Sequence, residues 1–100
     1  MAAVDLEQVE ATLQRIQNHR GVVGYIILNH EGQYIKTTLD NSTTQQYQNL
    51  ISTIAAKGKA LVREIDPVDN LRFLRIKSQK HEIMIAPDND YILIVIQDPL

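Results

Sequence analysis

Apolar residues in the first part of the chain recur at three- and four-residue steps, which places them on one stripe of a helix over about residues 4–19. Acidic residues lie in the early turns and basic residues in the late turns, the order that complements the helix dipole. Gly21 follows at the position where a left-handed residue commonly ends a helix. The stripe consists of Leu6, Val9, Leu13 and Ile16.

The next stretch changes to the pattern of β-strands. Residues 22–29 are mostly β-branched, aromatic or large and apolar, as in a strand covered on both faces. Asn29 to Gly32 have turn chemistry, and Gly32 can adopt a positive φ. Residues 33–39 then return as a second strand, so we expect a hairpin.

A long helix is predicted to follow this hairpin and to run to about Arg63. Residues 40–44 are suited to capping, and Thr43 with Gln46 three positions later fits a capping box. Part of the helix surface is unusually small, which would allow either close approach of a second helix or tight packing on the chain's own sheet. The small residues are Ala55, Ala56, Gly58 and Ala60.

Three strands are expected after a Pro-containing loop at residues 66–70, joined by a two-residue and a Pro-led connection. The strands span residues 71–77, 80–86 and 90–97. The last is apolar at every position from 91 to 96, so we expect it at the centre of the sheet, between helices. The order helix, two strands, helix, three strands predicts an α+β fold in which helices sandwich a five-stranded antiparallel sheet.

The strand at residues 71–77 has two interpretations. Its charges, and those of the following strand, are typical of an exposed edge that discourages uncontrolled pairing. The strand is also apolar on both faces, which favours a second copy that extends the sheet across a two-fold axis. The basic group is Arg72, Arg75, Lys77, Lys80 and His81, with Glu82 at its end, and the apolar group is Leu71, Phe73, Leu74 and Ile76.

Length and composition exclude several classes of protein. A chain of 100 residues has the length of one domain, and we expect residues 1–100 to form one. A net charge of −2, with both signs mixed, argues against nucleic-acid binding. The absence of cysteine excludes disulfide scaffolds and thiolate zinc sites. No signal peptide is visible, and no apolar run approaches the roughly 20 residues of a membrane span. We expect an intracellular protein without membrane insertion.

No group of residues has the spacing of an active, metal or cofactor site. His19, His30 and His81 are isolated, without a second ligand at metal-binding spacing. Residues 88–90 follow a proline between two strands and lack the length of a calcium loop. Residues 21–24 precede a strand, so they cannot cradle a phosphate as a glycine-rich loop before a helix does. We therefore expect no catalysis, no metal and no cofactor.

Short strings spread over nearly the whole chain match a known family. They lie at residues 21–24, 29–32, 35–41, 62–67, 69–71, 73–76, 80–84, 86–88, 90–91 and 93–97. The strings of the C-terminal half are the most specific, for example Val62-Arg63-Glu64-Ile65-Asp66-Pro67. Through them the chain resembles the roadblock-type light chains of the dynein motor, with departures at Tyr25, His30, Gln33, Tyr34 and Ser42.

The resemblance implies a non-catalytic homodimer in which the third strands pair to give a ten-stranded sheet and the long helices pack beside the same two-fold axis. It implies that the dimer binds the dynein intermediate chain in microtubule-based transport, in the cytoplasm or in a ciliary or flagellar axoneme. The dimer interface would consist of Ile54, Gly58, Leu61, Val62, Ile65, Leu71, Phe73, Leu74, Arg75 and Ile76. The intermediate chain would bind the first-helix stripe of Leu6, Val9, Leu13 and Ile16, although this stripe could instead simply cover its own sheet.

The resemblance leaves a second function open. The chain is less similar to distant members of the superfamily, such as bacterial polarity regulators and lysosomal scaffold subunits, which share the fold. Some of these act as regulators or scaffolds of small GTPases. No arginine of this sequence stands out as a finger that would complete a GTPase site, so we expect scaffolding at most on this alternative.

Overall fold

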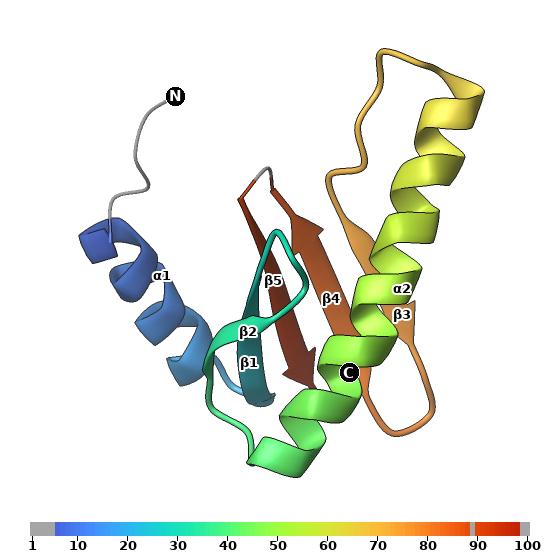
Figure 1. Ribbon diagram of the computed structural model, residues 1–100. Helices are drawn as coiled ribbons and strands as arrows, with labels where there is room; N and C mark the ends of the chain where they lie inside the picture. The colour runs from blue at the N-terminus through green and yellow to red at the C-terminus, as the bar shows by residue number, and fades with distance from the viewer. Residues whose placement is uncertain (1–5, 89, 99–100) are drawn as a thin grey trace.

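The computed structural model describes residues 6–88 and 90–98, in which two helices flank one sheet (Figure 1). The strands are antiparallel and follow the order β2-β1-β5-β4-β3. None of the helices in this part of the chain is long and apolar enough to cross a bilayer. The elements are α1 (Leu6–Asn18), β1 (Val22–Asn29), β2 (Tyr34–Thr37), α2 (Asn41–Ile65), β3 (Leu74–Lys77), β4 (Glu82–Pro87) and β5 (Tyr91–Gln97).

The predicted α+β fold, with a five-stranded antiparallel sheet between helices, is confirmed. β5 is the central strand, as its continuous apolar run indicates, and β3 lies at an edge. The structure contains one copy of the chain, so the ten-stranded sheet stays a prediction.

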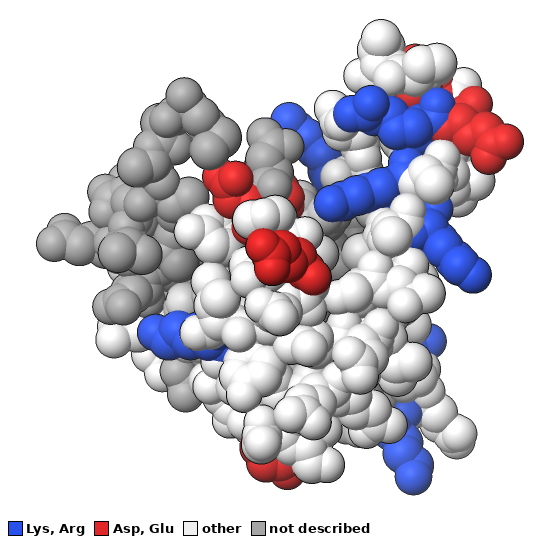
Figure 2. Space-filling view, viewed as in Figure 1, with Lys and Arg blue, Asp and Glu red and all other residues white. Residues whose placement is uncertain are grey.

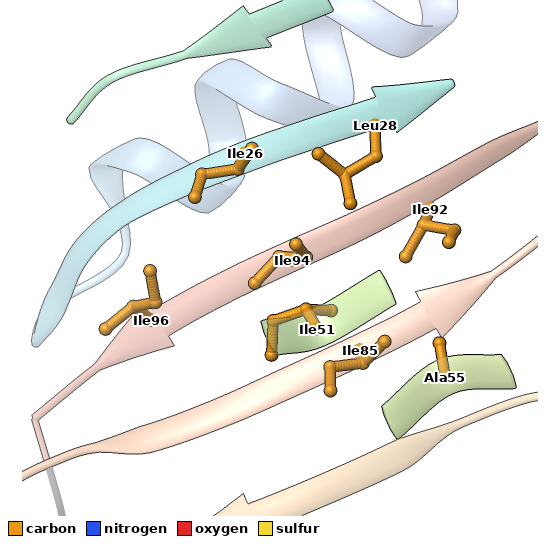
Figure 3. Packing of buried hydrophobic residues seen from close by; sticks show 8 residues of the cluster. All are labelled: Ile26, Leu28, Ile51, Ala55, Ile85, Ile92, Ile94 and Ile96. Atoms are coloured by element: carbon orange, nitrogen blue, oxygen red, sulfur yellow. The ribbon is translucent and has the colours of Figure 1, made fainter. Parts of the chain in front are cut away.

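The sheet buries apolar side chains on both faces because successive residues of a strand point to opposite sides. On the α2 face, three isoleucines of β5 meet residues of β1, β4 and α2 (Figure 3). On the α1 face, Leu13 of α1 packs with side chains of β1 and β5. The first cluster is Ile26, Leu28, Ile51, Ala55, Ile85, Ile92, Ile94 and Ile96, and the second is Leu13, Tyr25, Ile27 and Val95.

Two glycines take the left-handed conformations that the sequence indicates. Gly21 follows α1 with φ of 89° and Gly32 closes the β1–β2 turn with φ of 85°. In that turn, the Asn29 side-chain oxygen accepts hydrogen bonds from the backbone N–H groups of Glu31 and Gln33, at 3.0 and 2.9 Å. The hairpin is therefore specified locally.

The start of α2 differs from the prediction. The helix begins at Asn41, and its N-cap is Asp40, whose carboxylate accepts a hydrogen bond of 2.7 Å from the Thr43 backbone N–H. The capping box at Thr43 was wrong because the carboxylate three residues earlier caps the same amide. α2 ends at Ile65, two residues beyond the predicted end at Arg63.

The two edge strands are shorter than predicted. β2 ends at Thr37, whose hydroxyl accepts a hydrogen bond from the Leu39 backbone N–H and turns the chain toward α2. β3 begins only at Leu74, since Leu71 packs over Gly58 of α2 instead of pairing with β4. In addition, Pro87 at the end of β4 has no backbone N–H that could donate a hydrogen bond to a longer β3. The β3–β4 connection spans residues 78–81, so the two-residue link was wrong.

The boundaries of the other elements differ from the predictions by up to two residues. α1 is described from Leu6 and ends at Asn18, one residue before the predicted end, and the predicted start at residue 4 lies outside the described residues. β4 spans Glu82–Pro87 and β5 begins at Tyr91. In the turn between them, Asp88 donates its backbone N–H to the Tyr91 carbonyl at 2.7 Å. The ends of these elements are decided by which backbone groups form hydrogen bonds, and the period of apolar residues in the sequence does not report this.

We predict that Ile94→Ala lowers the free energy of unfolding by about 2–5 kcal/mol, because the substitution leaves a cavity in a fully buried position of the central strand. Urea denaturation followed by circular dichroism measures the change. Ile35→Ala is the matched control, since Ile35 lies on β2 with 53% of its surface exposed, and we expect a loss under about 1 kcal/mol. Equal losses for the two variants would contradict the assigned core.

We predict that the stabilising effect of Asp40 depends on pH. Hydrogen bonds from the side chain and backbone of Thr43 hold the pKa of Asp40 below its usual value of 3.8. The charged form thus favours the folded state, so its contribution is complete above the usual pKa and is lost as pH falls through the lower folded value. The difference in urea midpoint between the wild type and Asp40→Asn should narrow as the pH falls from about 5 toward 3. A constant difference would argue against this cap.

Candidate interaction surface

The outer edge of β3 is open to pairing. The backbone N–H of Ser78 donates to the His81 carbonyl at 2.8 Å, so Ser78 faces β4. Because the backbone groups of successive residues point to opposite sides, those of Arg75 and Lys77 face outward. Among the described residues, no side chain makes a hydrogen bond to the backbone N–H of either. β3 therefore presents an unpaired hydrogen-bonding edge.

The opposite edge of the sheet, at β2, is blocked. The Tyr34 backbone N–H donates to Oε1 of Gln48 on α2 at 2.8 Å. The register shifts between Ile27 and Leu28, because Ile27 pairs with Lys36 and Leu28 with Tyr34, which leaves Ile35 as a bulged residue. A bulge and a side-chain cap both prevent a regular ladder with another strand. Of the two edges, only β3 suits sheet extension.

A second apolar feature runs along α2. Leu61 and Ile65, four residues apart, are 59% and 78% exposed. Ile54 is also exposed and lies two helical turns before Leu61. Leu50 belongs to the same stripe, and its helical spacing from Ile54 could have identified it from the sequence. The stripe of Leu50, Ile54, Leu61 and Ile65 lies apart from the buried side of the helix at Thr44, Ile51 and Ala55.

The ten residues expected at the dimer interface divide into two groups. Leu74 and Ile76 pack on the core cluster beneath α2, and Leu71 lies against Gly58, where the Cβ atom of any other residue would approach Leu71 Cδ2 to 3.0 Å. This part of the small surface of α2 therefore packs on its own chain. Phe73 is 51% exposed. The exposed group is Ile54, Leu61, Ile65, Phe73 and Arg75, and the half-buried group is Gly58, Val62, Leu71, Leu74 and Ile76.

Glu82 occupies a position that the sequence did not indicate. It was expected at the end of an exposed basic hairpin, but only 1% of its surface is exposed. Its carboxylate forms an ion pair with Arg75 of β3 and accepts a hydrogen bond of 3.3 Å from Nε2 of Gln97 on β5. Arg75 and Gln97 lie on the two strands that flank β4, so the burial depends on the order of the strands in the sheet, which no local pattern of residues reports.

The predicted intermediate-chain surface is only partly available. Leu13 is buried against the sheet and Ile16 packs beside it, so these two residues cover their own sheet. The side chains of Leu6 and Val9 lie outside those that the structure describes. Next to Ile16, however, an apolar groove of about 350 Å³ continues across the α1 face of the sheet. Its lining includes Ile16, Val22, Phe73, Met84, Leu93 and Val95.

A second cavity, of about 510 Å³, lies between α2, the segment before β3 and the end of β4. Lys59, Arg63 and Arg72 line it, and Figure 2 shows basic side chains gathered beside the C-terminal half of α2. Nη2 of Arg63 donates to Oδ1 of Asn70 at 2.6 Å. The four-residue spacing of Lys59 and Arg63, which places both on one side of α2, is a signal for this basic group that the sequence contains.

The described residues contain no cluster of three or more potential metal ligands. His19 and His30 are exposed, and His30 lies 3.7 Å from the Glu31 carboxylate, while His81 is half-buried in the β3–β4 connection. The open β3 edge and the exposed apolar α2 stripe together form a surface that suits contacts with another protein.

Comparison with solved structures shows the fold. A Roadblock/LC7 domain from Streptomyces avermitilis is 13% identical over 88% of this chain and 73% of that chain, with a TM-score of 0.77. MglB from Myxococcus xanthus is 15% identical over 98% of this chain and 75% of that chain, with a TM-score of 0.74. A structure of MglB with a tetrameric arrangement is 10% identical over 98% of this chain and 76% of that chain, with a TM-score of 0.75. These likenesses concern the arrangement of the backbone.

The family follows from the sequence match. The model of the Roadblock/LC7 domain family matches residues 8–98, which include every helix and strand described above except the first two residues of α1. The chain belongs to the Roadblock/LC7 domain family.

Proposed function

We propose that this protein is a non-catalytic assembly subunit that pairs with a second copy of itself through β3 and the α2 stripe. The open β3 edge beside exposed Phe73 is the observation that carries the proposal. A chain of 100 residues buries only about 65% of the surface of its unfolded form, so a second copy would add to a small core. The Roadblock/LC7 family is generally non-catalytic, which agrees with this role.

For the partner, we propose the dynein intermediate chain, bound by the dimer as part of a motor that works on microtubules in the cytoplasm or in an axoneme. The support is the series of roadblock-type strings in the C-terminal half of the sequence. A disordered intermediate-chain segment that orders on binding would find apolar cover in the groove beside Ile16 and Phe73. Leu6 and Val9 remain proposed contacts because they belong to the apolar stripe predicted from the sequence, and Ile16 of that stripe lines this groove.

A second candidate is a scaffold or regulator of a small GTPase. The observation that favours it is the likeness in fold to MglB, which is a regulator of a small GTPase. The solved structures compared above are bacterial members of the family, and none of them is a dynein subunit. The likeness in fold supports this candidate better than the dynein subunit. The short roadblock-type sequence strings favour the dynein subunit instead. The two candidates share the self-pairing step and differ in the partner.

We predict that Phe73→Asp converts the protein to a monomer and lowers its melting temperature, because a charge buried without a partner in an interface costs several kcal/mol. Analytical ultracentrifugation measures the mass. Ile35→Asp is the control, since Ile35 has nearly the same exposure, 53% against 51%, and lies on the blocked edge. We expect this variant to stay a dimer. A dimeric Phe73→Asp variant would rule out pairing through β3.

We predict that affinity purification from the source cells recovers dynein intermediate and heavy chains, identified by mass spectrometry. The Phe73→Asp variant should recover much less of both, because Phe73 lines the groove proposed for the intermediate chain and also lies at the proposed self-pairing edge. Repeated recovery of a small GTPase without dynein chains, or acceleration of GTP hydrolysis by the pure protein, would instead support the second candidate.

A further inference from the structure

We infer that Glu82 is a positioning residue for self-association: its buried carboxylate neutralises Arg75 so that two positively charged β3 strands can lie side by side. The inference rests on the proposed pairing through β3. It names a residue that the interface expected from the sequence does not contain.

The first step is the register of the pairing. Residues directly opposite each other in an antiparallel pair lie on the same face of the sheet, so odd residues of β3 must face odd residues of the second copy. Registers that pair at least three of the four β3 residues therefore place Arg75 opposite either Arg75 or Lys77 of that copy. Like charges directly opposite each other destabilise a sheet, so the pairing needs a compensating charge.

The second step is the place of Glu82. Residue 82 pairs with Lys77 on β3 and with Gln97 on β5, on the sheet face that carries Arg75. Its carboxylate reaches diagonally to Arg75, whose side chain is 55% exposed, and is held from the other side by Gln97. Arg75 is thus anchored at its guanidinium while remaining on the open edge.

The third step is the cost of this arrangement. A carboxylate buried as completely as that of Glu82 is unfavourable unless it is paired and hydrogen-bonded, and a single copy gains little from burying one there. The contact between the side chains of His30 and Glu31, by contrast, is exposed on both sides. The burial of Glu82 beneath the edge strand is explained if the charge it cancels would otherwise oppose a second copy.

The test is Glu82→Gln, which keeps the shape of the side chain and removes the charge. Sedimentation equilibrium at low ionic strength should show a dimer dissociation constant raised about tenfold or more, since like-charge juxtaposition in an interface costs more than about 1.4 kcal/mol. In 1 M salt, where the screening length falls to about 3 Å, the ratio of the variant and wild-type constants should shrink. Glu64→Gln, at an exposed position of α2, is the control and should leave the constant unchanged.

The double variant Glu82→Gln with Arg75→Gln separates charge compensation from a merely structural role. We expect it to restore the wild-type constant to within about threefold, because both the carboxylate and the charge that it compensates are gone. Circular dichroism and amide spectra report whether each variant is folded. The inference would be overturned if a folded Glu82→Gln variant had an unchanged dissociation constant. It would also be overturned if neither salt nor the second substitution restored a weakened dimer. Neither outcome would contradict the proposed dimer. A monomeric wild type would instead overturn the proposed function.

Discussion

The burial of β5 on both faces is the constraint on which the rest of the structure depends. Ile94 and Ile96 enter the cluster beneath α2, while Val95 enters the cluster beneath α1. A strand of this kind cannot face water on either side, so it requires neighbours on both edges and a helix on both faces. β1 and β4 supply the edges, and this arrangement leaves β2 and β3 as the outer strands.

The two outer strands, β2 and β3, differ in whether their outer edge is open to a further strand. β2 is short, carries a bulge at Ile35 and has the Tyr34 amide capped by Gln48, so it ends the sheet. Among the described residues, no side chain caps an outward-facing backbone N–H of β3, and the exposed Phe73 lies directly before its first residue, Leu74. A sheet with one blocked and one open edge extends by a single further copy, because the outer edges of the resulting pair are again the blocked ones. This asymmetry is the physical reason why the proposed pairing would stop at two copies rather than continue as a filament.

The charges of β3 also affect which partners can pair with its outer edge. Basic residues on an edge strand discourage chance pairing with other proteins, and in β3 they are Arg75 and Lys77. The buried carboxylate of Glu82 cancels one of these charges from within the sheet. An edge built in this way repels partners in general and admits one whose register suits the compensated arginine, which is how charge supplies specificity more than affinity.

The sequence by itself determined the order of elements, the central place of β5, the edge position of β3 and the turns at Gly21 and Gly32. These features depend on the period of apolar residues and on local backbone chemistry, which act over a few positions. Only the tertiary structure decided the burial of Glu82, the packing of Leu71 on Gly58 and the shortening of β3 to Leu74–Lys77. It also divided the expected interface into exposed and self-packed residues. Each of these results depends on contacts between different elements of the fold, and the period of residues within one element does not encode such contacts.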